Sequence, residues 1–192
     1  MAHVIQHPAL QALKAQFPDV QFFVREFRGM VTVVVPRERI AAVCAWLRDD
    51  PGQRYEMLAE LNGVDYLNFP NATHRFAINY GLTSVSNNTR LWLKVFLDPA
   101  QDTSQGHDVR DEEAVEKGDA GLKLDSVTRV WPGAEWMERE AYDMFGFVFV
   151  GHPDLRRILT WNGYGSYPLR KDYPLRGIGE REDYQIVTRD SA

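Results

Sequence analysis

Hydrophobic and polar residues alternate along several stretches of the first hundred residues. In TRLWLKVFL, residues 89–97, leucine and valine at every second position alternate with tryptophan, lysine and phenylalanine. Because side chains of a strand point to opposite faces in turn, this pattern predicts a strand with one face on the core. Residues 20–27 and 30–35 indicate a strand pair around Arg28-Gly29, and residues 55–67 and 74–81 add two more strand candidates.

Two early segments instead show the spacing of helices. HPALQALKAQFP, residues 7–18, has a proline at its start, a proline at its end and an apolar face that includes Leu13. Pro36 begins a second helix, whose buried stripe is Ile40, Val43, Cys44 and Leu47, so the cysteine is interpreted as a core residue. The order of elements predicts an α+β fold with helices packed on a mainly antiparallel sheet.

A third helix is predicted over residues 132–145, between Pro132 at its first turn and Gly146 at its C-terminal cap. On a wheel of about 100° per residue, an apolar arc contains Trp136, Met137, Ala141, Met144 and Phe145. Glu135, Arg139 and Asp143 lie opposite and are interpreted as a solvated ladder of charges. Glu140 falls inside the apolar arc.

A buried Glu140 needs a cation, because an unpaired carboxylate in an apolar setting is costly. Arg156 and Arg157 are the nearest candidates in the sequence, and a buried ion pair with one of them is the favoured interpretation. The alternative is a general acid whose pKa is raised by its surroundings. His152 lies in the turn GHPD and is interpreted as hydrogen-bonded to backbone or to a partner.

The last thirty residues have no regular period. From Phe147 to Gly179 the chain contains five Arg or Lys residues and two Asp residues, with tyrosines and leucines between prolines. Such a segment resembles an arm that binds along a partner. The predicted organisation is therefore one α+β globular domain over 1–162 and an extended partner-binding arm over 163–192.

Charge and cysteine content narrow the classes of function. The net charge is −5, but residues 98–121 carry eight acidic and two basic residues, so the rest is close to neutral. This acidic stretch is predicted to be a mobile loop. The lack of a basic excess in the rest of the chain argues against a nucleic-acid binder. Cys44 is the only cysteine, whereas an iron–sulfur cluster needs about four thiolate ligands. Neither a signal peptide nor a membrane span is expected.

The stretch EREAYDMFGFVFVGHPDLRRIL, residues 138–159, resembles the signature of the C subunit of bacterial NADH-quinone oxidoreductase, the small hydrophilic-arm subunit family of respiratory complex I. The E-R-E triplet, an acidic residue three positions later, a histidine and then basic and aliphatic residues are all present. PLRKDYPL, residues 168–175, resembles a second hallmark of that family. The likeness covers most of the chain, and the acidic stretch at 98–121 is longer than the family leads us to expect.

The resemblance implies a non-catalytic structural subunit of a hydrophilic arm that supports electron transfer from NADH to quinone in a proton-pumping assembly. No cofactor is expected on this chain, while the assembly is expected to use FMN, iron–sulfur clusters, NADH and quinone. The expected partners are chiefly the large quinone-site subunit and neighbouring iron–sulfur subunits. The expected location is the cytoplasmic face of the bacterial plasma membrane, with membrane contact only through the complex and no nucleic acid bound.

The residues expected to act structurally or at an interface lie in both motifs and in the turn between them. They are Glu138, Arg139, Glu140, Asp143, His152, Arg156, Arg157, Arg170, Lys171, Tyr173 and Arg176. Two alternatives remain open: the equivalent subunit of a related membrane-bound oxidoreductase or hydrogenase, and a free-standing hydrolase that uses Glu140 and His152.

Overall fold

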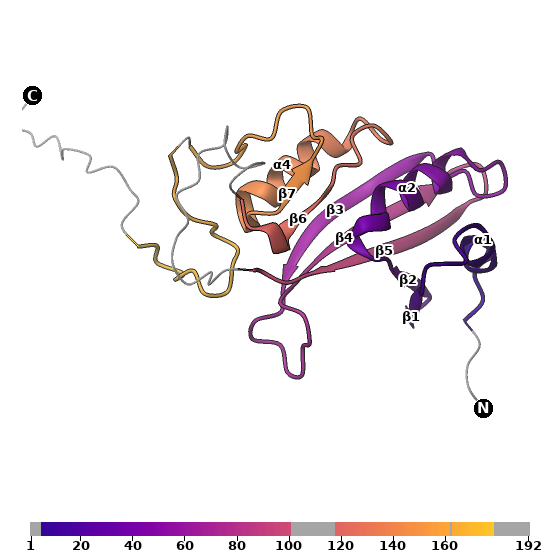
Figure 1. Ribbon diagram of the computed structural model, residues 1–192, viewed down its shortest axis with the longest axis horizontal. Coiled ribbons are helices and arrows are strands. Elements are labelled where there is room, and N and C mark those ends of the chain that lie inside the picture. Colours follow the sequence, from indigo (N-terminus) through magenta and orange to yellow (C-terminus); the bar gives the residue numbers. More distant parts are fainter. Residues whose placement is uncertain (1–4, 101–117, 162, 179–192) are drawn as a thin grey trace, which may run out of the picture.

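The computed structural model describes residues 5–100, 118–161 and 163–178 (Figure 1). The elements follow the order helix, two strands, helix, three strands, and then a smaller unit. Their bounds are α1 Pro8–Gln16, β1 Phe23–Phe27, β2 Met30–Val34, η1 Arg37–Arg39, α2 Ile40–Asp49, β3 Met57–Asp65, β4 Phe76–Ser84, β5 Thr89–Leu97, η3 Ala120–Leu122, β6 Lys123–Asp125, α4 Ala134–Phe145 and β7 Val148–Val150.

Five strands form one sheet in the order β1-β2-β5-β4-β3. Every neighbouring pair is antiparallel except β2 and β5, which run parallel. The short hairpins β1–β2 and β4–β5 close locally, whereas the parallel pair needs the intervening chain to cross over the sheet. The predicted α+β class with a mainly antiparallel sheet is confirmed.

One face of this sheet lies on the core and the other does not. In β5 the four residues at odd positions from Leu91 to Leu97 are buried, and the residues between them are half-buried. Ile40, Val43, Cys44 and Leu47 of α2 are all buried, as the helical spacing predicted. Figure 1 shows α2 lying along the sheet, and the core fills the space between them.

A second, smaller unit was not predicted from the sequence. β6 and β7 form a parallel pair, and α4 connects them along the chain. Each strand has three residues, which is too short for an alternating pattern to appear. Figure 1 shows this unit beside the five-stranded sheet. The described residues that follow β7, 151–161 and 163–178, are called the C-terminal segment, and its yellow part lies at the end away from α1.

The acidic stretch 98–121 is described only at its ends. Asp98 accepts a hydrogen bond from the backbone N–H of Arg75 at 2.8 Å. Asp119 accepts from the backbone N–H of Ala100 at 2.8 Å and of Gly121 at 2.7 Å. The two ends are thus held together by a carboxylate. The prediction of a mobile loop falls on residues 101–117, which lie outside the described residues.

Candidate functional site

The last turn of α4 places Asp143 where the following chain folds back over it. Its side chain is fully buried, and Oδ2 accepts the backbone N–H groups of Ile158, Leu159 and Thr160 at 3.0, 2.7 and 2.8 Å. Burial alone would raise the pKa of Asp143, but hydrogen bonds from the Thr160 hydroxyl and these N–H groups hold the pKa below its ordinary value. The carboxylate therefore fixes a backbone turn.

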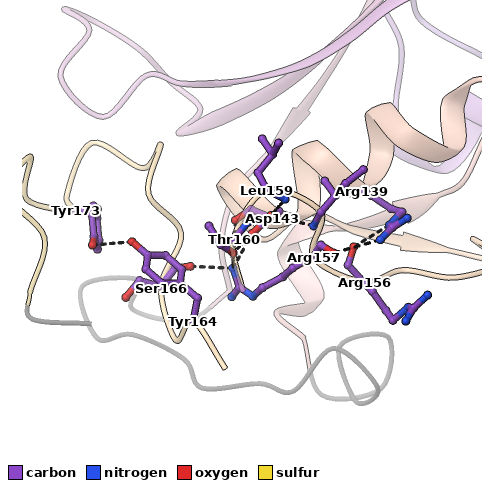
Figure 2. Close-up of polar contacts among 10 residues, drawn as sticks. Arg139, Asp143, Arg156, Arg157, Leu159, Thr160, Tyr164, Ser166 and Tyr173 are labelled. Atoms are coloured by element: carbon purple, nitrogen blue, oxygen red, sulfur yellow. Dashed lines mark hydrogen bonds and ion pairs between the residues drawn. The ribbon is translucent and has the colours of Figure 1, made fainter. Parts of the chain in front are cut away.

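Arg157 supplies the cation for this carboxylate. Its guanidinium donates to Asp143 Oδ1 at 3.0 Å and to the carbonyl of Ser166 at 3.0 Å, with both side chains buried (Figure 2). Three tyrosine rings surround it at 5.1 to 5.9 Å, those of Tyr142, Tyr164 and Tyr167. A buried arginine in such a setting joins α4 to two parts of the C-terminal segment at once.

Arg139 binds the same segment from one turn earlier in α4. It donates from Nε to the carbonyl of Arg156 at 3.0 Å and from Nη2 to that of Arg157 at 3.2 Å. The side chain of Arg156 points to the surface, where it pairs with Asp154. Of the two predicted arginines, only Arg157 enters the interior.

A second buried arginine comes from the region of PLRKDYPL. Arg170 donates from Nε to the carbonyl of Phe145 at 2.7 Å, and its guanidinium lies 4.3 Å from the ring centre of Tyr167. Burial lowers the pKa of Arg170. Gly146 allows this approach: its φ is +78°, and a Cβ built there would lie 2.6 Å from Arg170 Nη2. The turn after α4 therefore needs glycine for its backbone and for space.

The same segment is also tied to the five-stranded sheet. At the end of β3, Asp65 accepts from the backbone N–H of Lys171 at 2.8 Å and from that of Leu67 at 2.9 Å. Arg75 donates to Asp172 at 2.7 Å and lies 3.4 Å from Asp65. These contacts place residues 170–172 at the junction between the sheet and the smaller unit.

While its backbone is held inward, this segment presents apolar side chains outward. Five large apolar residues between 159 and 178 are exposed: Leu159, Trp161, Leu169, Leu175 and Ile178. We call them the C-terminal apolar surface. Solvent-exposed apolar side chains on a well-fixed backbone are typical of a binding surface for another protein.

Comparison with known proteins connects this geometry to one family. Residues 33–178 match the model of a family described as respiratory-chain NADH dehydrogenase, 30 Kd subunit. The chain belongs to this family. The matched range contains the end of β2, the other three strands that follow it in the sheet, the smaller unit and the whole C-terminal apolar surface. It confirms the resemblance seen in the two motifs.

Related sequences carry the name of the same subunit. The NADH-quinone oxidoreductase C subunit of Geotalea uraniireducens is 37% identical over 177 residues, which cover 92% of each chain. That of Geobacter sulfurreducens is 38% identical over 177 residues, 92% of this chain and 94% of the relative. The C subunit of Maricaulis maris is 43% identical over 152 residues, and there the match spans only 64% of the relative.

Two solved structures share the fold. A trypsin-resistant fragment of Nqo5 has a TM-score of 0.53 at 29% identity, covering 78% of this chain and 100% of the fragment. A chain of a membrane-bound sulfane sulfur reductase, an archaeal respiratory membrane complex, has a TM-score of 0.61 at 20% identity, covering 87% and 84%. The second likeness concerns the fold alone.

In this member of the 30 kDa subunit family, the prediction for Glu140 is wrong. Glu140 is exposed, and Arg157 pairs with Asp143 instead. Asp143 is correspondingly not part of a solvated ladder. Of the predicted apolar arc, Ala141, Met144 and Phe145 are buried and Met137 is half-buried, but the side chain of Trp136 is 62% exposed. Near its C-terminal end, α4 is also covered by residues 158–160, which fold back over it. A helical wheel does not represent such a tertiary contact.

Glu138 is the other buried carboxylate of α4. It accepts from the backbone N–H of Val127 at 2.7 Å and from the Ser126 hydroxyl at 2.6 Å. Burial raises its pKa to about 7, against the opposing effect of these two hydrogen bonds. Both of these donors are neutral, so Glu138 joins α4 to the chain after β6 as a hydrogen-bond acceptor.

His152 makes the backbone contacts that were predicted for it. Its Nδ1 accepts from the N–H of Asp154 at 3.0 Å, which leaves the proton on Nε2 for donation to the carbonyl of Glu135 at 3.1 Å. Burial lowers the pKa of His152, which favours this neutral tautomer. Both ring nitrogens are thus engaged with backbone, an arrangement that does not favour the hydrolase alternative.

The predicted boundary between domain and arm does not coincide with a change from packed to free chain. Residues 163–178 pack on α4 and β3 through Arg170, the backbone of Lys171 and the carbonyl of Ser166. Tyr173 also hydrogen-bonds to Tyr164, hydroxyl to hydroxyl, at 2.7 Å (Figure 2). The side chains of Lys171 and Arg176 are exposed. Residues 179–192 lie outside the described residues.

Four residues of the site were not predicted from the sequence: Asp65, Arg75, Thr160 and Ser166. Asp65 had a local signal, because an aspartate that ends a strand and caps the N–H two residues later is a common turn. The others act through partners distant in sequence, so their residue types alone carried no signal.

Neither a metal cluster nor a membrane span is found in the part of the chain that the structure describes. No group of three or more His, Cys, Asp or Glu side chains there is arranged to hold a metal. No helix within the described ranges has the length and apolar character needed to cross a bilayer.

Proposed function

We propose that this chain is a non-catalytic structural subunit of a proton-pumping NADH-quinone oxidoreductase, and that it packs against the large quinone-site subunit and neighbouring iron–sulfur subunits. The observation that carries the proposal is the C-terminal apolar surface. Its backbone is fixed by Asp143, Arg157 and Arg170, while Trp161 and four aliphatic side chains remain exposed. Such preorganisation reduces the entropy lost on docking.

The chemistry of the buried groups supports a structural role. The side chains of Asp143, Arg157 and Arg170 all hydrogen-bond to backbone groups of the chain. His152 hydrogen-bonds to backbone through both ring nitrogens. Burial raises the pKa of the Cys44 thiol well above its usual range, so this residue is a poor thiolate ligand. We propose that FMN, iron–sulfur clusters, NADH and quinone are bound by other subunits, at the cytoplasmic face of the plasma membrane.

A second candidate is the equivalent subunit of a related membrane-bound complex with another electron donor. The fold shared with the sulfane sulfur reductase complex is compatible with it. The names of the relatives at 37% to 43% identity favour the NADH-dependent assembly. Mass spectrometry of the subunits that co-purify with this chain separates the two, because only the NADH-dependent assembly contains a flavin-binding NADH-oxidising subunit.

The interface is tested by placing carboxylates on the C-terminal apolar surface. Leu159→Glu combined with Leu175→Glu changes two side chains that are 64% and 103% exposed, so the free energy of unfolding of the chain should stay within about 0.5 kcal/mol. Co-purification with the large subunit should fall roughly tenfold or more. Val85→Glu is the matched control, because Val85 is 69% exposed in the β4–β5 turn. Normal assembly of the double variant would refute the proposed interface.

A further inference from the structure

The second face of the five-stranded sheet carries no helix of the described chain. This face carries Phe23, Arg25 and Phe27 on β1, Met30 and Thr32 on β2, and Trp92 and Lys94 on β5. All of them are exposed or half-buried. On β2 and β5 these residues alternate with buried ones. A sheet face with aromatic and methionine side chains left in water is unusual for a chain that functions alone.

Trp92 shapes this face into two hollows. It lies opposite Gly81 in the register of β4 and β5, and a Cβ built on Gly81 would lie 3.1 Å from the indole ring. The indole therefore lies across β4, where any larger residue would displace it. It lines a hollow of about 440 Å³ on the β1–β2 side and one of about 330 Å³ on the β3 side.

Two cations line the larger hollow, and a third lines its neighbour. Arg25 and Lys94 line the larger hollow together with two asparagines, and Arg90 lines the neighbouring hollow. Glu60, which accepts a hydrogen bond from the side chain of Asn62, is the only carboxylate among the residues that line either hollow. On a chain with net charge −5, this face is thus locally positive. Lys94 is held in place by its contact with the Tyr66 hydroxyl at 3.0 Å.

Apolar side chains form the rim beside these cations. Phe27 and Met30 are 55% and 48% exposed at the turn of the β1–β2 hairpin, and Met57 is 50% exposed at the start of β3. An aromatic side chain, an apolar rim and neighbouring cations are the features that bind a segment carrying both apolar and acidic side chains.

We propose that the open sheet face around Trp92 is a second protein-docking surface, which binds an acidic segment of another polypeptide. An aliphatic or aromatic side chain of that segment packs on Trp92, and a carboxylate lies between Arg25 and Lys94. This surface shares no residue with the C-terminal apolar surface. An experiment that refutes one of the two interfaces therefore does not refute the other. Three cations are too few for the stripe that a nucleic acid requires.

The test is photo-cross-linking within the assembled complex. A benzophenone amino acid replaces Thr32, on the floor of the larger hollow, and in a parallel strain replaces Met30 on its rim. After irradiation of membranes, the tagged chain is purified and the cross-linked peptide is identified by mass spectrometry. The expected result is a cross-link from both positions to one segment of another subunit that contains Asp or Glu beside a large apolar residue.

Charge reversal then tests the recognition chemistry. Arg25→Glu should lower the cross-link yield roughly tenfold, because it places a carboxylate against the acidic segment. Arg129→Glu is the matched control, since it makes the same charge change at an exposed position outside both hollows and should leave the yield unchanged.

Several outcomes would overturn the proposal. One is that the complex assembles but neither position gives a cross-link. Others are a cross-link to lipid, to nucleic acid or to a second copy of this chain, or a cross-linked protein segment that contains no carboxylate. Equal yields from Arg25→Glu and Arg129→Glu would also overturn it. Co-purification of the large subunit, measured on the same samples, shows that assembly through the C-terminal apolar surface is intact.

Discussion

Arg157 donates to the carboxylate of Asp143 across 3.0 Å, and their side chains are 3% and 0% exposed. This pair joins the last turn of α4 to the chain that returns over it. Because Asp143 Oδ2 also accepts three backbone N–H groups, the pair fixes the start of the C-terminal segment.

Loss of the Asp143 charge should therefore destabilise the subunit. Asp143→Asn leaves Arg157 buried without its counter-ion and should lower the free energy of unfolding by about 3–5 kcal/mol. Glu140→Gln is the matched control on the same helix, and since Glu140 is exposed it should change stability by less than about 0.5 kcal/mol. Urea denaturation of both variants measures the difference. Similar midpoints for the two would contradict the assignment.

Two glycines share the left-handed backbone conformation, so replacing each by alanine separates the cost of backbone strain from the cost of steric crowding. Gly146 and Gly151 have φ of +78° and +83°, but only at Gly146 would a Cβ meet Arg170 and Tyr167. Gly151→Ala should cost about 1–2 kcal/mol from the left-handed backbone alone. Gly146→Ala should cost roughly 2 kcal/mol more, because Arg170 must give up its site on Phe145. Thermal unfolding followed by circular dichroism measures both, and equal costs would show that Arg170 adapts freely.

The stability of the subunit should depend on pH through Glu138. Its pKa is raised to about 7 in the folded chain, so the unfolded chain ionises first as pH rises from about 4.5. Stability from this group is present below the unfolded pKa and is lost as pH rises through the folded pKa. Between pH 5 and 8.5 the wild type should lose roughly 2–3 kcal/mol relative to Glu138→Gln, which has no charge to bury. A stability difference that stays constant over this range would count against the raised pKa.

Removal of the C-terminal segment beyond residue 162 should lower the free energy of unfolding of the domain itself. Truncation after Asn162 deletes Arg170, the carbonyl acceptor of Ser166 and the N–H that caps Asp65. We expect a loss of at least about 3 kcal/mol, because several buried polar groups lose their partners. The double variant Lys171→Ala, Arg176→Ala keeps the backbone and should melt like wild type. A truncated chain with an unchanged melt would restore the boundary at 162.

The sequence by itself determined the elements of the large sheet. Alternation in residues 89–97 named the buried residues of β5, and helical spacing named all four buried residues of α2. These features depend on a local period, since each side chain's direction follows from its position in a strand or helix. The glycine cap of α4 was equally local, because Gly146 adopts the left-handed conformation that few other residues tolerate.

Only the tertiary structure decided which carboxylates of α4 are buried. A wheel assumes one buried face, but Asp143 is covered by residues 158–160 and Glu138 by residues 126–127, while Glu140 stays in water. The same holds for the C-terminal segment, whose prolines and glycines predicted an extended chain but not the sites that hold it. Its position depends on Asp65, 106 residues away from Lys171 in the sequence. Contacts over such separations have no local period, so a single sequence carries no pattern from which to derive them.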